Sequence, residues 1–219
     1  MMGEYSRNFQ KNPDMYKLFY APNSASMGVR VLLEEIGVAY ELLSTTIDRA
    51  KARPPEQLAI NPNGWIPVLA WEGGAMYECA AITMFLGDRH PDAKLAPAIN
   101  DPARALYLQT LVFCSSSIQT AFQLTYYPHR FADTPAEEPS AQRRGNRRLH
   151  ETWTVLNDQI GEQQWVLGGE FSAVDVYLYM LTTWLSVELG HPSVDEFPNV
   201  QRIAAAVAQR PAVQRVYLA

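Results

Sequence analysis

The feature that most constrains this chain is a change of pattern near residue 90. From Tyr16 to His90, short apolar runs alternate with segments that have apolar residues three and four apart, whereas from Asp101 onward only the second pattern occurs. Short apolar runs between turn residues predict strands, and the three-and-four spacing predicts helices. The chain is therefore expected to fold as a mixed α/β domain followed by an all-helical domain.

The first part is expected to run βαβ, then α, then ββα. Its expected elements are a strand at 16–20, a helix at 26–37, a strand at 39–45, a short helix or turn at 54–60, a hairpin of 66–71 and 75–77, and a helix at 78–88. The helix at 26–37 ends on a glycine, which is typical of a helix C-terminus. The turn residues EGG between two short strands are typical of a hairpin.

The second part predicts helices alone. They are expected at 101–127, 141–160, 172–189, 200–208 and 212–218. The segment HPDAKLAPAINDP between the two parts is rich in proline and aspartate, as linkers often are. The expected organisation is a disordered N-terminal extension at 1–14, a first domain at 15–91, a linker at 92–101 and a helical domain at 102–219.

Composition excludes several function classes. The formal net charge of -5 argues against nucleic acid or an anionic membrane as the main partner. The two cysteines, Cys79 and Cys114, lie in neither a CxxC motif nor a histidine-rich cluster, so we expect no disulfide framework and no metal. No apolar run is long enough to span a membrane, and the polar start does not resemble a secretory signal. A cytoplasmic location is expected.

Ile66-Pro67 marks the start of the predicted hairpin. A proline cannot donate a hydrogen bond to a sheet, so it belongs at the first residue of a strand or on an edge. One interpretation is an ordinary strand-start proline. The other is a cis bond that turns the backbone of Ile66 outward, where it can pair with an extended peptide ligand as a further strand would.

Tyr77-Glu78-Cys79 lies where a short predicted strand passes into a helix. Free N–H groups at a helix N-terminus bind carboxylates, and the carboxylate of Glu78 can hold an ammonium group. Together they suit the zwitterionic end of an amino acid. The alternative is that Glu78 is only a favourable acidic residue in the first turn of a helix.

Taken together, NPNGWIPVL followed by ECAAI resembles the amino-terminal domain of the glutathione transferases. YKLFYAPNSASMGVRVLLEE is similar to that family's first strand, catalytic loop and first helix. GGEFSAVDVYLYML resembles its buried Ser-x-x-Asp helix start, and FPNVQRIAAAVAQRPAVQRVY resembles its closing helices. The resemblance covers residues 16–217. It implies a thioredoxin-like domain followed by an all-helical domain, a cis peptide bond at Pro67, and a homodimer.

The resemblance also implies how glutathione is held. The implied binding residues are Tyr20, Lys51, Arg53, Trp65, Ile66, Pro67, Glu78 and Cys79. The backbone of Ile66 would hold the cysteinyl part, while Glu78 and Cys79 would hold the γ-glutamyl part. The family most often has serine at the position of Cys79. Lys51 and Arg53 stand where the family often has a basic residue for the glycyl carboxylate, although such side chains on a loop are commonly just solvated.

An enzyme of this family must donate a hydrogen bond to the glutathione sulfur, because the thiolate is the nucleophile. By alignment, Ser24 matches the catalytic serine of delta-class enzymes, and Asn23 falls about where zeta-class and some bacterial enzymes have serine or threonine. Ala25 stands where beta-class enzymes have cysteine, so that chemistry is missing. Tyr20 matches the tyrosine of the alpha, mu and pi classes. We favour Ser24, then Asn23, then Ser26, which could also simply cap the helix.

Ser172 and Asp175 invite a catalytic interpretation that we reject. Ser-x-x-Asp before an apolar run is a helix capping arrangement, and the family uses it to fold the helical domain.

The sequence therefore predicts a glutathione transferase that binds glutathione, stabilises its thiolate, and conjugates it to a small hydrophobic electrophile or uses it as a reductant. One alternative is a non-catalytic glutathione-binding or interaction protein on the same fold. Another is a glutathione-dependent disulfide reductase or isomerase. The helical half, which sets the electrophile in this family, has no sharp motif.

Overall fold

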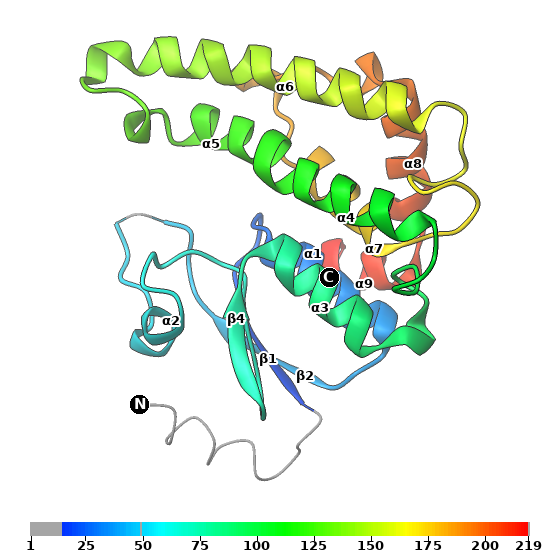
Figure 1. Cartoon of the computed structure of the whole chain (residues 1–219). Helices are drawn as coiled ribbons and strands as arrows, with labels where there is room; N and C mark the ends of the chain where they lie inside the picture. Colours follow the sequence, from blue (N-terminus) through cyan, green and yellow to red (C-terminus); the bar gives the residue numbers. More distant parts are fainter. Residues whose placement is uncertain (1–14, 49, 219) are drawn as a thin grey trace. The chain divides into compact units, whose positions relative to one another are not determined.

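The computed structural model describes residues 15–48 and 50–218, so the extension expected at 1–14 lies outside the described residues (Figure 1). The chain forms two compact units. The first runs up to Ala93 and also includes the residues from Pro211 onward; the second is Lys94–Arg210. The final helix thus belongs with the first unit, whereas the sequence grouped it with the helical domain. The exact domain limits stay a prediction.

The first unit is built on a four-stranded mixed sheet. Its strands are β1 (Tyr16–Tyr20), β2 (Tyr40–Ser44), β3 (Val68–Trp71) and β4 (Gly74–Tyr77). They lie in the order β2-β1-β3-β4, with β1 parallel to β2 and antiparallel to β3, and with β3 antiparallel to β4. The predicted strand and hairpin order, and the thioredoxin-like α/β class, are confirmed.

Several α-helices accompany this sheet among the described residues. They are α1 (Ser26–Ile36), α2 (Pro55–Ile60), α3 (Cys79–Arg89) and α9 (Pro211–Tyr217). Helix α1 buries Val29, Leu32 and Leu33 and packs against both α3 and α9 (Figure 1). It ends at Gly37, whose φ of 76° is left-handed and therefore suits glycine.

The second unit is all-helical, as predicted. Its helices are α4 (Ala103–Phe113), α5 (Thr120–Tyr126), α6 (Glu138–Ile160), α7 (Ala173–Thr182) and α8 (Pro198–Ala208). A π-helical segment, Cys114–Gln119, joins α4 to α5, so the long helix expected at 101–127 is continuous but locally wider. None of the described helices has the length and apolar character that a membrane span requires.

The helix expected at 172–189 is shorter than predicted and ends at Thr182. The hydroxyls of Thr182 and Thr183 donate back to the carbonyls of Tyr179 and Met180 at 2.7 and 2.6 Å. The chain then turns, because the backbone N–H of Ser186 donates to a ring nitrogen of the buried His191 at 3.1 Å. Short 3-10 turns lie at Pro91–Ala93, Pro128–Arg130, Pro135–Glu137, Val187–Leu189 and Val194–Glu196.

Candidate functional site

The register of the sheet brings three loops to one end of the first unit. Phe19 pairs with Val68, and Val68 pairs with Tyr77. Each of these residues lies at or next to the point where its strand meets a predicted site segment. The loop that follows β1, the Ile66-Pro67 step and the start of α3 are therefore neighbours, although the sequence separates them widely.

The loop between β1 and α1 is closed by its own serines. Ser24 Oγ lies 2.7 Å from the carbonyl oxygen of Ala21 and 2.6 Å from Ser26 Oγ, and Ser26 Oγ lies 3.2 Å from the same carbonyl. The N–H of Ala21 donates to Ser26 Oγ at 3.2 Å. Each serine hydroxyl has one proton. One proton is donated to the Ala21 carbonyl and the other lies in the bond between the two hydroxyls, so both are used within the loop. Both side chains are buried.

Asn23 has the opposite character. It is exposed, its φ of 57° is left-handed, and its backbone N–H lies 3.2 Å from Met27 Sδ. Asparagine tolerates this conformation better than most residues. Within residues 15–48 and 50–218, no hydrogen-bond partner is found for its side-chain amide. Asn23 is therefore the polar side chain of this loop that is free to donate outward.

Tyr20, the last residue of β1, faces α1. The guanidinium carbon of Arg30 lies 5.4 Å from the centroid of its ring. The side chain is half-buried. A cation over an aromatic face is a stabilising contact, so Tyr20 has a structural partner on α1.

The Ile66-Pro67 bond is cis, which confirms that interpretation over an ordinary strand-start proline. Strand β3 begins only at Val68, and Ile66 is half-buried. Its backbone N–H and C=O have no hydrogen-bond partner in the described part of the chain. Trp65 beside it is 44% exposed. An unpaired donor and acceptor next to a strand can accept an extended ligand.

Two buried amides that the sequence did not single out hold the segment before Ile66. Gln57 Nε2 donates to the carbonyls of Gly64 and Trp65 at 2.9 and 3.4 Å. Asn61 Nδ2 also donates to the Trp65 carbonyl, at 3.1 Å. Asn61 belongs to the NPNG motif and could have been suspected. Gln57 could not, because a polar residue in a short helix normally faces water.

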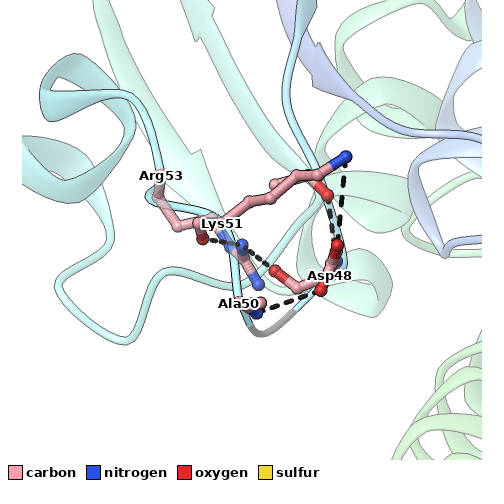
Figure 2. A network of polar contacts seen from close by, with 5 residues as sticks. Asp48, Ala50, Lys51 and Arg53 are labelled. Carbon is pink, nitrogen blue, oxygen red and sulfur yellow. Dashed lines mark hydrogen bonds and ion pairs between the residues drawn. The ribbon is translucent and has the colours of Figure 1, made fainter.

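Arg53 is largely occupied by the backbone (Figure 2). Its Nη1 donates to the carbonyls of Asp48 and Lys51 at 2.7 and 2.8 Å, and its Nε donates to that of Gly64 at 3.2 Å. Nη2 has no partner in the described segments and keeps two N–H groups. Lys51 Nζ lies 3.9 Å from an Asp48 carboxylate oxygen and is mostly in solvent. Of the two basic residues, Arg53 is the one held in place.

The start of α3 is also shaped for a ligand. Glu78 adopts a φ of 77°, which is uncommon for a residue with a side chain and costs energy. It is exposed, and α3 has no side-chain cap, so its first-turn N–H groups have no acceptor within the helix. Cys79 is buried, and its Sγ lies 3.6 Å from the carbonyl oxygen of Ala25. The thiol thereby links this helix to the loop after β1.

Ser172 and Asp175 form the expected capping box. The N–H and hydroxyl of Ser172 donate to Asp175 Oδ2 at 2.8 and 3.0 Å, and the N–H of Val166 donates to Oδ1 at 2.9 Å. Burial raises the pKa of Asp175 to about 6, against these hydrogen bonds. Both carboxylate oxygens of Asp175 thus accept hydrogen bonds from within the helical unit. No group of three metal-ligating side chains occurs among the residues that the structure describes.

Comparison with known proteins follows the same division of the chain. Residues 24–89 match the family model described as glutathione S-transferase, N-terminal domain, and residues 139–206 match glutathione S-transferase, C-terminal domain. The glutathione S-transferase GstA of Escherichia coli O157:H7 is 26% identical over 90% of this chain and 95% of its own length. Glutathione S-transferase D7 of Drosophila melanogaster is 30% identical over 87% of this chain and 82% of its own length.

Among solved structures, a sphingomonad glutathione S-transferase complexed with glutathione is similar with a TM-score of 0.77 and 26% identity. The similarity covers 91% of this chain and 96% of that one.

Proposed function

The chain belongs to the glutathione S-transferase family, and from this premise we propose that its first unit binds glutathione and that the bound thiolate is transferred to a small hydrophobic electrophile. Glutathione is the cosubstrate of enzymes of this family. The proposal rests on one observation above all: Ile66 presents an unpaired backbone donor and acceptor at the same end of the sheet as the uncapped start of α3.

Each part of glutathione finds a group of the right chemistry. The cysteinyl backbone pairs with Ile66, as a further strand would. The γ-glutamyl carboxylate binds the first-turn N–H groups of α3 at Cys79, and its ammonium group binds the carboxylate of Glu78. The glycyl carboxylate takes the free Nη2 of Arg53, with Lys51 as an additional cation. Trp65 and Pro67 flank the cysteinyl position.

The residue that donates a hydrogen bond to the glutathione sulfur in this proposal is Asn23. A free thiol has a pKa of about 8.5 and is mostly protonated at neutral pH. A hydrogen bond to the charged form lowers that pKa. The hydroxyl protons of Ser24 and Ser26 are used within the loop, whereas the amide of Asn23 is exposed and unpartnered among the described residues. These contacts favour Asn23 over Ser24, and they leave Ser24 and Ser26 the task of shaping the loop.

Isothermal titration with glutathione tests the binding step. We expect saturable binding, and its absence at millimolar glutathione would contradict the proposal. The ultraviolet absorbance of the bound thiolate, followed against pH, tests catalysis. If bound glutathione titrates as it does in water, the chain is a non-catalytic glutathione-binding protein. If the pKa of bound glutathione is lowered instead, activity with a chloro-nitro aromatic, a disulfide or a cis-alkene distinguishes conjugation, reduction and isomerisation.

The proposal includes a homodimer and a cytoplasmic location, which are the family's ordinary state. Sedimentation velocity of the purified chain measures the first, and fractionation of the source cells measures the second. A monomer over the whole micromolar range would remove the dimer from the proposal without affecting glutathione binding.

A further inference from the structure

Gln57 makes three hydrogen bonds from a fully buried position. It is 0% exposed, and it is the buried residue of the six-residue helix α2. Its Oε1 accepts from Thr45 Oγ1 at 2.6 Å, and its Nε2 donates to the carbonyls of Gly64 and Trp65 at 2.9 and 3.4 Å. A polar side chain is costly to bury unless its hydrogen bonds are made. Here they are made to two different loops.

These two loops lead to different parts of the candidate site. The backbone N–H of Thr45 donates to the carbonyl of Tyr20 at 3.0 Å, at the point where the loop with Asn23 begins. On the other side, Gly64 and Trp65 immediately precede Ile66. Gln57 therefore completes a chain of hydrogen bonds from the end of β1 to the residue before Ile66.

The neighbouring polar residues do not duplicate this link. Arg53 and Asn61 bond the same pair of carbonyls, but their other contacts stay within residues 48–65. Among the described residues, Gln57 is the side chain that bonds both Thr45, next to the end of β2, and the segment before Ile66. A helix as short as α2 has little stability of its own, so this buried amide also fixes where α2 sits.

We propose that Gln57 is a positioning residue, which sets the separation between the loop that contains Asn23 and the backbone of Ile66. The inference rests on the proposed glutathione function. Gln57 itself touches neither the thiol nor the reacting atoms. Its loss would let Ile66 move relative to Asn23, and a binding site loosened by about an ångström loses much of its affinity and catalytic effect.

The test compares three variants of the full chain. Gln57→Leu keeps the volume and removes all three bonds, while Thr45→Val removes only the bond to Oε1. Tyr16→Phe is the matched control, since it removes a half-buried hydrogen bond to His90, at 2.8 Å, at the opposite end of β1. The measurements are the dissociation constant for glutathione by isothermal titration, and the amide chemical shifts and nitrogen-15 relaxation of Ala21, Trp65 and Ile66 in the free protein.

We expect Gln57→Leu to raise the dissociation constant about tenfold or more, and Thr45→Val to raise it by a smaller factor. Both should alter the amide signals at Trp65 and Ile66. Combining them should add little to Gln57→Leu, because both remove the same bond. Tyr16→Phe should lower the melting temperature and leave the dissociation constant unchanged.

An unchanged dissociation constant and unchanged Ile66 signals in Gln57→Leu would overturn the inference. If Gln57→Leu does not fold, Thr45→Val decides by the same two measurements. If the wild-type chain binds no glutathione, the proposed function fails instead. The signals of Trp65 and Ile66 in the ligand-free variants then still decide whether Gln57 positions this segment.

Discussion

At the residue scale, the polar side chains of the loop after β1 fall into two kinds, those that bond within the loop and one that faces outward. Ser24 and Ser26 are buried and bond to each other and to Ala21, so they define the shape of the loop. Asn23 is carried on the outside in a left-handed conformation. A donor on a fixed backbone has a low cost of reorganisation when charge develops on the ligand.

Asn23→Ala should therefore raise the pKa of bound glutathione by about one unit or more, which corresponds to roughly 1.4 kcal/mol of lost thiolate stabilisation. Alanine tolerates the left-handed backbone of this position less well than asparagine, so the free energy of unfolding should also fall, by about 1 kcal/mol. Ser24→Ala is the matched comparison. It should lower the free energy of unfolding by about 1–2 kcal/mol through the lost buried bonds, with a smaller effect on the thiolate. The opposite pattern would make Ser24 the donor.

His191 is expected to make stability depend on pH. Its Nδ1 accepts from the Ser186 N–H and its Nε2 lies 3.0 Å from Thr125 Oγ1, so the ring is neutral with the proton on Nε2. Burial lowers the pKa of His191 from its ordinary value of 6.5. Below about pH 6.5, His191 binds a proton more readily in the unfolded chain than in the folded chain. The stability of the helical unit should therefore fall as the pH decreases.

Urea unfolding between about pH 7.5 and about pH 5 measures this effect. Stability should be fully retained above the ordinary histidine pKa and lost progressively below it. His191→Gln supplies the control, since its unfolding free energy should be lower at high pH and should vary less over the same range. Equal slopes for the two proteins would mean that another group is responsible.

Sequence reasoning at this scale found the residue types but could not see how the hydroxyls were used. The sequence favours Ser24 because it aligns with a known catalytic serine, and alignment does not reveal that its hydroxyl donates to the carbonyl of Ala21. Which residue contacts the glutathione sulfur stays a prediction. Gln57 was missed for a related reason. Nothing in PEQLAI distinguishes a buried glutamine from a solvated one, because the helix is too short for a clear periodicity.

At the element scale, α5 and α6 approach closely at one glycine. A Cβ added to Gly145 would lie 2.7 Å from Thr125 Cγ2, 2.8 Å from Leu124 Cβ and 3.1 Å from the Ala121 carbonyl oxygen. In an open helix, glycine to alanine would stabilise by about 1 kcal/mol. Here the overlap includes backbone, and overpacking of this kind costs about 1–3 kcal/mol.

Gly145→Ala should therefore destabilise the helical unit by up to about 2 kcal/mol, with α5 displaced from α6. Chemical unfolding gives the free energy, and amide exchange along α5 gives the location. Arg144→Ala, at an exposed position of the same helix, is the control and should change stability by less than about 0.5 kcal/mol. A stabilised Gly145→Ala variant would show that the two helices can separate at no cost.

Element boundaries were predictable where a residue typical of helix ends or turns marks them, and not elsewhere. Gly37 and the turn EGG placed the end of α1 and the hairpin well. The end of α7 was missed, because apolar spacing continues past Thr182 while the chain has already turned. The threonine hydroxyls bond back to carbonyls of the last helical turn, and the N–H of Ser186 bonds to His191. These polar contacts do not change the spacing of apolar residues, so periodicity does not reveal them.

At the scale of the whole molecule, the order of elements was predictable because each half has its own repeating pattern. The resemblance then implied a cis bond at Pro67, which the structure confirms, and a glutathione-binding role for the Ile66 segment, which stays a prediction. What the pattern could not supply was the destination of the last helix. Residues 212–218 read as one more helix, but α9 packs on α1 in the first unit.

This return of the chain gives a prediction about folding. Helix α9 buries Ala212, Val213 and Val216, and Arg215 Nε donates to Glu34 on α1 at 2.7 Å. A chain shortened after Arg210 would expose the face of α1 that α9 covers. Burial of two valines and an alanine is worth roughly 3–5 kcal/mol, so the first unit should lose about that much stability and most of its glutathione affinity at elevated temperature.

Urea unfolding and glutathione titration of the shortened chain measure both effects. Arg215→Ala isolates the ion pair, and because the Arg215 side chain is 54% exposed the pair should account for less than about 1 kcal/mol. If Arg215→Ala alone reproduced the effect of truncation, α9 would be held by charge rather than by its buried face.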